Sequence, residues 1–331
     1  FLYNTVVLVV IAFSFLWGTL FPIITEAVRG EKITVGPPFF NAVNIPLGLT
    51  LLLLTGIGPL IAWRRASVAN LQRQFAGPVI AGLTTGFVLV LFGMRDVPAI
   101  IAYTFAGFVA MTVVQEFYKG VGARHRMYGE SIVPAFAHLV ARNRRRYGGY
   151  IVHMGVVVVF AAFAGLAFKK EFDVTLKSGD SKELVDPFGH KWKFVSQGLS
   201  QYNLLNRQVT ALALDLTRDG KSVGVLTTEK RQHVDSRGAP TFEPSTEVGI
   251  RESWRQDVYV VLAGVREDQS AEIRVTFNPL VRWVWLGGGL MAIGGLIVMW
   301  PQAERRRPQS GYAVAMPPIE TQAPERELAG V

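Results

Sequence analysis

The chain has 331 residues, half of them apolar, and its mean hydropathy is positive. This composition is typical of a membrane protein with room for one soluble domain. The absence of cysteine excludes disulfides and leaves no thiolate in this chain to act as nucleophile, metal ligand or redox pair. The net charge is +9, but residues 169–280 carry 16 basic and 16 acidic residues, so the excess lies elsewhere. A basic nucleic-acid-binding face on a soluble domain is therefore excluded.

Six apolar runs divide the chain, and their lengths lie in the range of transmembrane helices. They predict an α-helical polytopic membrane protein of six transmembrane helices with an inserted small antiparallel β domain, either a sheet or a barrel. The runs cover about residues 4–24, 44–63, 77–93, 98–118, 148–168 and 281–300. The expected domains are helices one to five with basic loops at 1–168, the β domain at 169–280, helix six at 281–301, and a disordered tail at 302–331.

The basic residues outside the neutral segment alternate between loops, and 14 of these 18 fall in the loops 64–76 and 119–147 and in the tail. Lysine and arginine concentrate in cytoplasmic loops. We therefore expect the N-terminus, these two loops and the tail in the cytoplasm. The 169–280 domain then lies on the outer face, which in a bacterial inner membrane is the periplasm.

The outer segment has the pattern of β structure. Residues 208–216 and 223–228 flank Asp219-Gly220, and Asp-Gly between extended runs is a strong hairpin signal. Further strands are expected at 257–262 and 272–277. Together these runs predict a small antiparallel domain between the fifth and sixth helices.

The chain begins at Phe1 and enters an apolar run at once. This run is too long and has the wrong flanks for a cleavable signal. We interpret the chain as a fragment or one half of a longer protein.

His153 is the single ionisable residue in the fifth apolar run, which four arginines of the segment 142–146 precede. An ionisable group inside a span is costly and usually has an assigned partner. Gly149 is a helical neighbour at i−4, and Ala161 and Ala164 lie further along the same face. Small residues of this kind let a helix or a flat cofactor approach closely. Two interpretations stay open: a ligand or proton-relay histidine, and a neutral imidazole hydrogen-bonded to the next helix.

The remaining polar candidates favour ordinary structural roles. His125, His138, His190 and His233 lie in loops or in the β domain, where a solvated or structural histidine is expected. Glu116, near the inner end of the fourth run, is expected to be exposed at the membrane interface. No phosphate-binding loop, HExxH or paired-cysteine motif occurs, and the sequence assigns no catalytic residue.

Five distinctive stretches occur in an ordered series over about residues 4–300. They are Val35-Gly36-Pro37-Pro38-Phe39-Phe40-Asn41, Gly56-Ile57-Gly58-Pro59-Leu60 with Trp63-Arg64, His153 with Gly155, Thr228-Glu229-Lys230-Arg231, and Asn278-Pro279-Leu280-Val281-Arg282-Trp283-Val284-Trp285 with Gly287-Gly288. In this series the chain resembles the C-terminal half of the CcmF-type haem lyases of bacterial cytochrome c maturation.

The resemblance implies that the chain takes part in attaching haem to apocytochrome c, and it implies a haem b cofactor. In that family, a transmembrane histidine before the outer β domain is one axial ligand of a b-type haem, and His153 stands at this position. The second ligand, the tryptophan-rich WWD segment and two outer histidines belong to the N-terminal half, which would be a partner in the same or a separate chain. Further implied partners are a CcmE-type haem chaperone, apocytochrome c and its CcmH/CcmI-type thiol-handling proteins, and a membrane quinol as a source of electrons.

Two other functions remain as alternatives. A membrane scaffold that docks cytochrome c assembly partners without binding haem would have the same topology. A haem spectrum with and without His153 separates the scaffold from the lyase. A secondary transporter would require inverted repeats and broken helices, and the spans contain no visible repeat.

Overall fold

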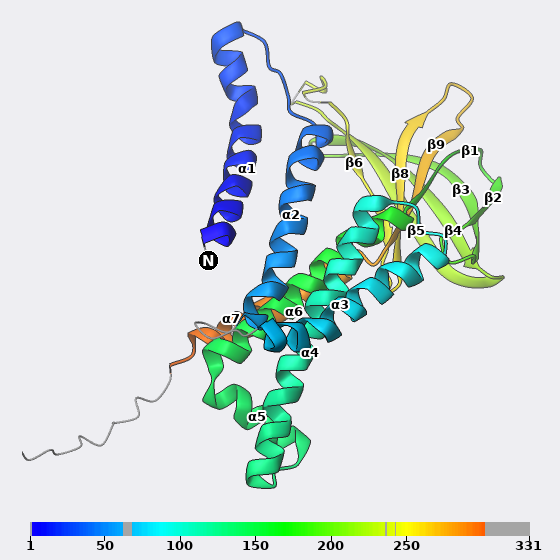
Figure 1. Cartoon of the computed structure of the whole chain (residues 1–331). Helices are drawn as coiled ribbons and strands as arrows, with labels where there is room; N and C mark the ends of the chain where they lie inside the picture. The colour runs from blue at the N-terminus through cyan, green and yellow to red at the C-terminus, as the bar shows by residue number, and fades with distance from the viewer. Residues whose placement is uncertain (1, 62–67, 236, 242, 302–331) are drawn as a thin grey trace, which may run out of the picture. The chain divides into compact units, whose positions relative to one another are not determined.

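The structure, a computed structural model, describes residues 2–61, 68–235, 237–241 and 243–301 (Figure 1). It is a helical membrane protein with an inserted β domain. The helices are α1 (Leu2–Arg29), α2 (Pro37–Leu60), α3 (Val68–Leu91), α4 (Val97–Tyr128), α5 (Ile132–Arg142), α6 (Arg144–Ala164), the 3-10 turn η1 (Gly165–Phe168) and α7 (Trp283–Met299).

Five helices of the described chain are long and apolar enough to cross a membrane: α1, α2, α3, α4, and α6 together with η1. The first five predicted spans are therefore present as helices. The sixth is present as α7, but its 17 residues lie at the lower limit for a span. The predicted tail at 302–331, and the Arg64-Arg65 part of one basic loop, lie outside the described residues.

Local sequence signals explain where α4 begins and ends. The Asp96 side chain caps the helix by accepting a hydrogen bond from the Ala99 backbone N–H at 2.8 Å, and Pro98 lies in the first turn. Both features satisfy or remove backbone donors that the helix leaves free. Gly129 ends the helix with φ of 65°, a left-handed conformation that glycine adopts without strain. This helix forms one wall of the site described below.

Helices α6 and α7 pack backbone to backbone. A Cβ added to Gly155 would lie 2.7 Å from the carbonyl oxygen of Gly287, and one added to Gly294 would lie 2.8 Å from that of Gly148. Only glycine permits this approach, as in other membrane helix pairs with small residues at the interface. The pairing runs antiparallel, and it fixes one face of the helix that carries His153.

Two other helices pack on α6. The Tyr103 hydroxyl of α4 donates to the Ala161 carbonyl at 2.9 Å, and Val157 is buried with Val109 of α4 and Leu52 of α2. The interior of the helical region therefore forms around α4 and α6, while α1 contacts chiefly α2.

The β domain consists of two antiparallel sheets, with strand orders β1-β9-β8-β7 and β2-β3-β4-β5-β6. The strands are β1 (Lys170–Leu176), β2 (Ser181–Val185), β3 (Lys191–Leu204), β4 (Arg207–Arg218), β5 (Lys221–His233), β6 (Ser245–Glu247), β7 (Gly249–Arg251), β8 (Gln256–Val265) and β9 (Ala271–Pro279). Alternate residues of β4, such as Leu212 and Leu214, are buried against Val260 of β8 and Phe277 of β9. This alternation is typical of a two-layer sandwich, so the predicted sheet or barrel is a sandwich.

The predicted hairpin is confirmed. Strands β4 and β5 pair in antiparallel register, and Asp219 and Gly220 both have positive φ, at 48° and 78°. Two consecutive residues of this kind match the right-handed twist of the strands that they join. The strands predicted at 257–262 and 272–277 are present within β8 and β9.

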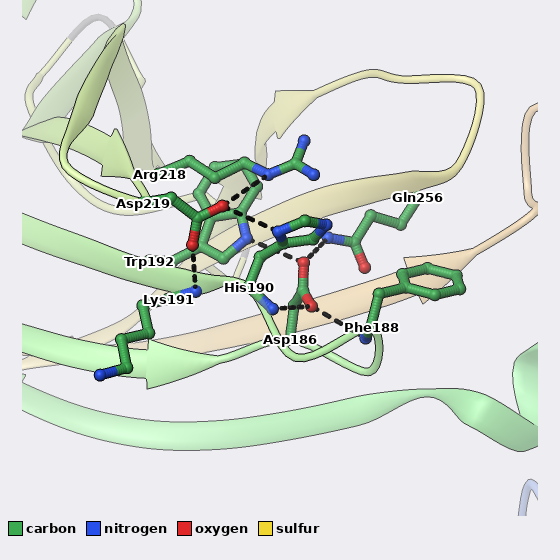
Figure 2. Close-up of polar contacts among 8 residues, drawn as sticks. All are labelled: Asp186, Phe188, His190, Lys191, Trp192, Arg218, Asp219 and Gln256. Atoms are coloured by element: carbon green, nitrogen blue, oxygen red, sulfur yellow. Dashed lines mark hydrogen bonds and ion pairs between the residues drawn. The ribbon is translucent and has the colours of Figure 1, made fainter.

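A buried carboxylate joins the two sheets of the sandwich (Figure 2). Asp186, after β2, is fully inaccessible and accepts hydrogen bonds from the backbone N–H groups of Phe188 at 2.8 Å and His190 at 2.9 Å. It also accepts from the Trp192 indole N–H at 3.0 Å and from the Gln256 amide of β8. Each carboxylate oxygen accepts from two donors, so the hydrogen-bonding capacity of this buried group is satisfied.

The two connections between the sandwich and the helices lie close together. A Cβ on Gly165 of η1 would lie 3.1 Å from the Pro279 carbonyl oxygen at the end of β9. The Trp283 indole of α7 donates to the Trp254 carbonyl at 2.8 Å. The chain therefore leaves the helical region through α6 and returns through α7 at one junction.

Candidate functional site

His153 lies within α6, and its side chain is largely but not fully buried. Its Nδ1 is buried and has no hydrogen-bond partner among the residues that the structure describes. The ring centroid of Tyr150 lies 6.5 Å away with the planes inclined at 55°. A buried polar atom without a partner requires an explanation such as an absent ligand or water.

Different helices cover the different faces of α6 around His153, and part of its surface is uncovered. Helix α7 covers the face with Gly148 and Gly155, and α4 covers the face with Tyr150 and Val157. Beside His153, one turn toward the start of α6, a Cβ added to Gly149 would meet no atom within 4 Å. The helix surface one turn from His153 is thus open at Gly149, and a surface without a side chain beside an imidazole fits a flat group such as a porphyrin.

A second polar cluster lies at the start of α6, and sequence reasoning missed it. Glu116 of α4 is only 6% exposed, so the expectation that it is exposed at the interface was wrong. Its Oε2 accepts from Arg146 Nη2 at 2.5 Å and from the Tyr150 hydroxyl at 3.1 Å, and Arg146 Nε donates to Tyr150 at 3.0 Å. The cluster neutralises the buried acid and ties α4 to α6.

The signal for this cluster was present but ambiguous. Glu116 is the single acid near the inner end of α4, and several arginines start α6. Lys119, one turn further along α4, approaches Glu116 Oε1 at 3.6 Å. The sequence does not reveal which cation pairs with the acid, because Glu116 and Arg146 are 30 positions apart.

Three other histidines have partners outside the helical core. Glu130, between α4 and α5, is approached by His138 Nδ1 at 3.1 Å and forms two hydrogen bonds with Arg124. The Arg124 hydrogen bonds are the main reason that the pKa of Glu130 is lowered. His125 contacts the Glu130 carbonyl, and His190 contacts Asp219 at 2.8 Å. These contacts agree with structural roles, and the described residues contain no group of three or more histidines, cysteines or acids arranged to hold a metal ion.

A separate apolar groove of about 730 Å³ lies among α1, α2, α4 and the end of α6. Phe15, Phe40 and Phe160 line it, together with Asn44. Asn44 accepts a hydrogen bond from Ser14 at 2.6 Å, while its Nδ2 is buried without a partner among the described residues. Neither His153 nor Arg146 lines this groove, so it is distinct from the histidine site.

Comparisons with known proteins agree with one another. A family model described as the CcmF C-terminal β-sandwich matches residues 167–279. The cytochrome c-type biogenesis protein CcmF of Pseudomonas fluorescens is 29% identical over 318 residues, which cover 95% of this chain and 45% of that protein. The CcmF of Escherichia coli K12 is 27% identical over 92% of this chain and 44% of its own length.

A solved structure, the cytochrome c haem lyase CcmF, matches with a TM-score of 0.65 and 25% identity. The match covers 90% of this chain and 45% of that structure. The chain thus spans about half the length of the curated relatives that it matches.

Fold and site first define a class: a polytopic membrane protein with a β-sandwich between two closely packed helices, one of which carries a largely buried histidine. Within that class, the chain is similar to CcmF-type proteins, and its β domain matches the family model of the CcmF C-terminal β-sandwich.

Proposed function

We propose that this chain acts in cytochrome c maturation as the C-terminal part of a membrane haem lyase that attaches haem to apocytochrome c. The relatives named for cytochrome c biogenesis and the structure named as a haem lyase support this proposal. The chain is incomplete for the reaction by itself, and we assign no catalytic residue within it. Because it has no cysteine, the thiols that form the thioether bonds come from apocytochrome c.

Within this function, His153 is an axial ligand of a transmembrane haem b, and a histidine outside this chain completes the iron ligation. The observation that carries this assignment is the buried Nδ1 without a partner, and the open helix surface at Gly149, one turn away on α6, supports it. A ligating histidine uses one ring nitrogen for the metal and usually donates a hydrogen bond from the other. The N-terminal half of the lyase, in the same or a separate chain, would supply the missing partners.

The bound haem would supply one-electron chemistry, with a membrane quinol as the electron source. The residues of this chain orient and protect that site. The close contact at Gly155 and Gly287 packs α6 against α7, so the face of α6 that carries His153 is fixed. The apolar residues Val156 and Val157 exclude water from the same part of the helix.

The proposed location is the bacterial inner membrane with the sandwich in the periplasm. The charge asymmetry of the loops supports this orientation. On that side the sandwich is available to a CcmE-type haem chaperone, to apocytochrome c and to CcmH/CcmI-type thiol-handling proteins. His153 then lies in the cytoplasmic half of the membrane, away from thioether formation, which favours electron supply as its role.

The reduced-minus-oxidised spectrum of the assembled membrane complex tests the assignment. His153→Ala should remove most of the b-type signal, because the iron loses an axial donor. His138→Ala is the matched control, since the His138 side chain is 59% exposed and should leave the spectrum unchanged. A His153→Ala complex that keeps a full low-spin b-type spectrum would refute the ligand assignment and favour a structural polar contact.

A further inference from the structure

We propose that Arg146 binds a propionate carboxylate of the haem that His153 ligates, and that Glu116 and Tyr150 are positioning residues for its guanidinium. This inference rests on the proposed function of His153. It assigns a role to the buried polar cluster between α4 and α6, which haem ligation by His153 alone does not use.

The helical spacing places the three key residues on one face of α6. Arg146, Gly149 and His153 occupy positions i, i+3 and i+7, which lie above one another on an α-helix. Seven residues correspond to about 10 Å along the axis. This separation is comparable to the reach from the iron of a porphyrin to its propionate carboxylates.

Gly149 leaves space for a porphyrin between the side chains of Arg146 and His153. A porphyrin plane is perpendicular to the bond between iron and imidazole nitrogen, so a ring ligated by His153 extends along the helix surface. The space beside Gly149 is open, because a Cβ built there would meet no atom within 4 Å, and glycine has no side chain to occupy this space. The ring edge can therefore lie over Gly149 with its carboxylates directed toward Arg146.

The guanidinium of Arg146 is held on one side and available on the other. Its Nη2 donates to Glu116 at 2.5 Å and its Nε to Tyr150 at 3.0 Å. Its Nη1 has no hydrogen-bond partner among the described residues, and 59% of the side chain is exposed. Arginine presents several donors in a rigid fork that matches a carboxylate, so the group can keep Glu116 and bind a second carboxylate.

A purely structural link between α4 and α6 accounts for the hydrogen bonds of Arg146 Nε and Nη2. It assigns no role to the exposed part of the guanidinium. A lipid phosphate could also bind there, since α6 begins at this end of a membrane span. The two anions differ in their effect on the haem. Loss of the partner of a propionate changes the retention of the porphyrin and the vibration of the propionate, whereas loss of the partner of a lipid phosphate changes neither.

The experiment compares Arg146→Gln with Arg145→Gln in the full membrane complex. Arg145 is the adjacent residue, exposed and about 100° around the helix. The measurements are the rate of haem transfer to excess apomyoglobin, the haem midpoint potential, and the resonance Raman frequency of the propionate bending mode. Arg146→Gln should release haem about tenfold faster, because a charge-assisted hydrogen bond is lost. It should also lower the potential, since a positive charge near the ferric iron disappears, and it should shift the propionate mode.

Two further variants guard against misfolding. Arg146→Lys keeps a cation for Glu116 and should give intermediate haem release and potential. Glu116→Gln removes a negative charge from the cluster and should raise the potential, the opposite direction to Arg146→Gln. Arg145→Gln should change none of the three measurements.

The outcomes separate this inference from the proposed function. Loss of haem in His153→Ala, together with unchanged haem release and an unchanged propionate mode in Arg146→Gln, would overturn the inference alone and would favour a lipid phosphate or a structural tie. A complex without haem b, or one whose haem survives His153→Ala, would overturn both.

Discussion

The β-sandwich and the helical region both contain a carboxylate that is nearly inaccessible to water, and they stabilise it differently. Asp186 in the sandwich accepts from two backbone N–H groups, an indole and an amide, all uncharged. Glu116 in the helical region accepts from a cation, Arg146, and from Tyr150. The uncharged donors of Asp186 are all committed to one residue, whereas the cation beside Glu116 retains unused donors. Asp186 is therefore a structural joint, and the Glu116 cluster is a site able to accept a ligand.

The largest loss of stability is expected when the hydrogen bonds of Asp186, which link the two sheets, are removed. Asp186→Ala leaves four buried donors without an acceptor, and uncompensated buried polar groups of this kind cost about 3–5 kcal/mol in total. We expect the sandwich to lose resistance to proteolysis while the helices of the solubilised protein remain folded. Asp173→Ala is the control, because its side chain is 71% exposed. Equal protease resistance of the two variants would show that Asp186 does not join the sheets.

A smaller loss of stability is expected at the contact between α6 and α7, where only glycine allows the two backbones to approach. Gly287→Val would place a Cβ 2.7 Å from the Gly155 carbonyl oxygen, and overpacking of this kind costs about 1–3 kcal/mol. We expect a lower melting temperature of the solubilised protein and weaker haem binding, because α6 shifts.

Gly288→Val is the matched control for that variant, since a Cβ on Gly288 meets nothing within 4 Å. If both valine variants melt at the same temperature as the unaltered protein, the close contact between α6 and α7 is not what positions His153.

A small effect of pH on stability is expected at Asp268, on the surface of the sandwich. Hydrogen bonds from Ser270, then from Lys177, lower the pKa of Asp268 from 3.8 to about 2. A lowered carboxyl pKa contributes stability that is fully present above the unfolded value and is lost as the pH falls through the folded value. Stability should therefore decrease between about pH 4 and pH 2, and Asp268→Asn should make the decrease smaller. Identical acid unfolding curves for the variant and the unaltered protein would contradict the assignment.

Much of the fold was predictable because its signals are local. Apolar runs predicted the five long helices, and the Asp219-Gly220 pair predicted the β4–β5 hairpin. His153 was predictable as a site candidate because one ionisable residue in an apolar span is visible without any tertiary information. Its role as a ligand stays a proposal.

The tertiary structure alone decided how distant residues meet. The pairing of Glu116 with Arg146 and of Asp186 with Gln256 joins positions 30 and 70 residues apart, and no local pattern encodes such contacts. The close approach of Gly155 to Gly287 is equally hidden, because glycine has the same appearance in a sequence whether it faces lipid or another backbone. Hydropathy and turn chemistry act over a few residues and so determined the elements. Long-range packing determined that Asp186 links the two sheets and that the Glu116 cluster is available to a ligand.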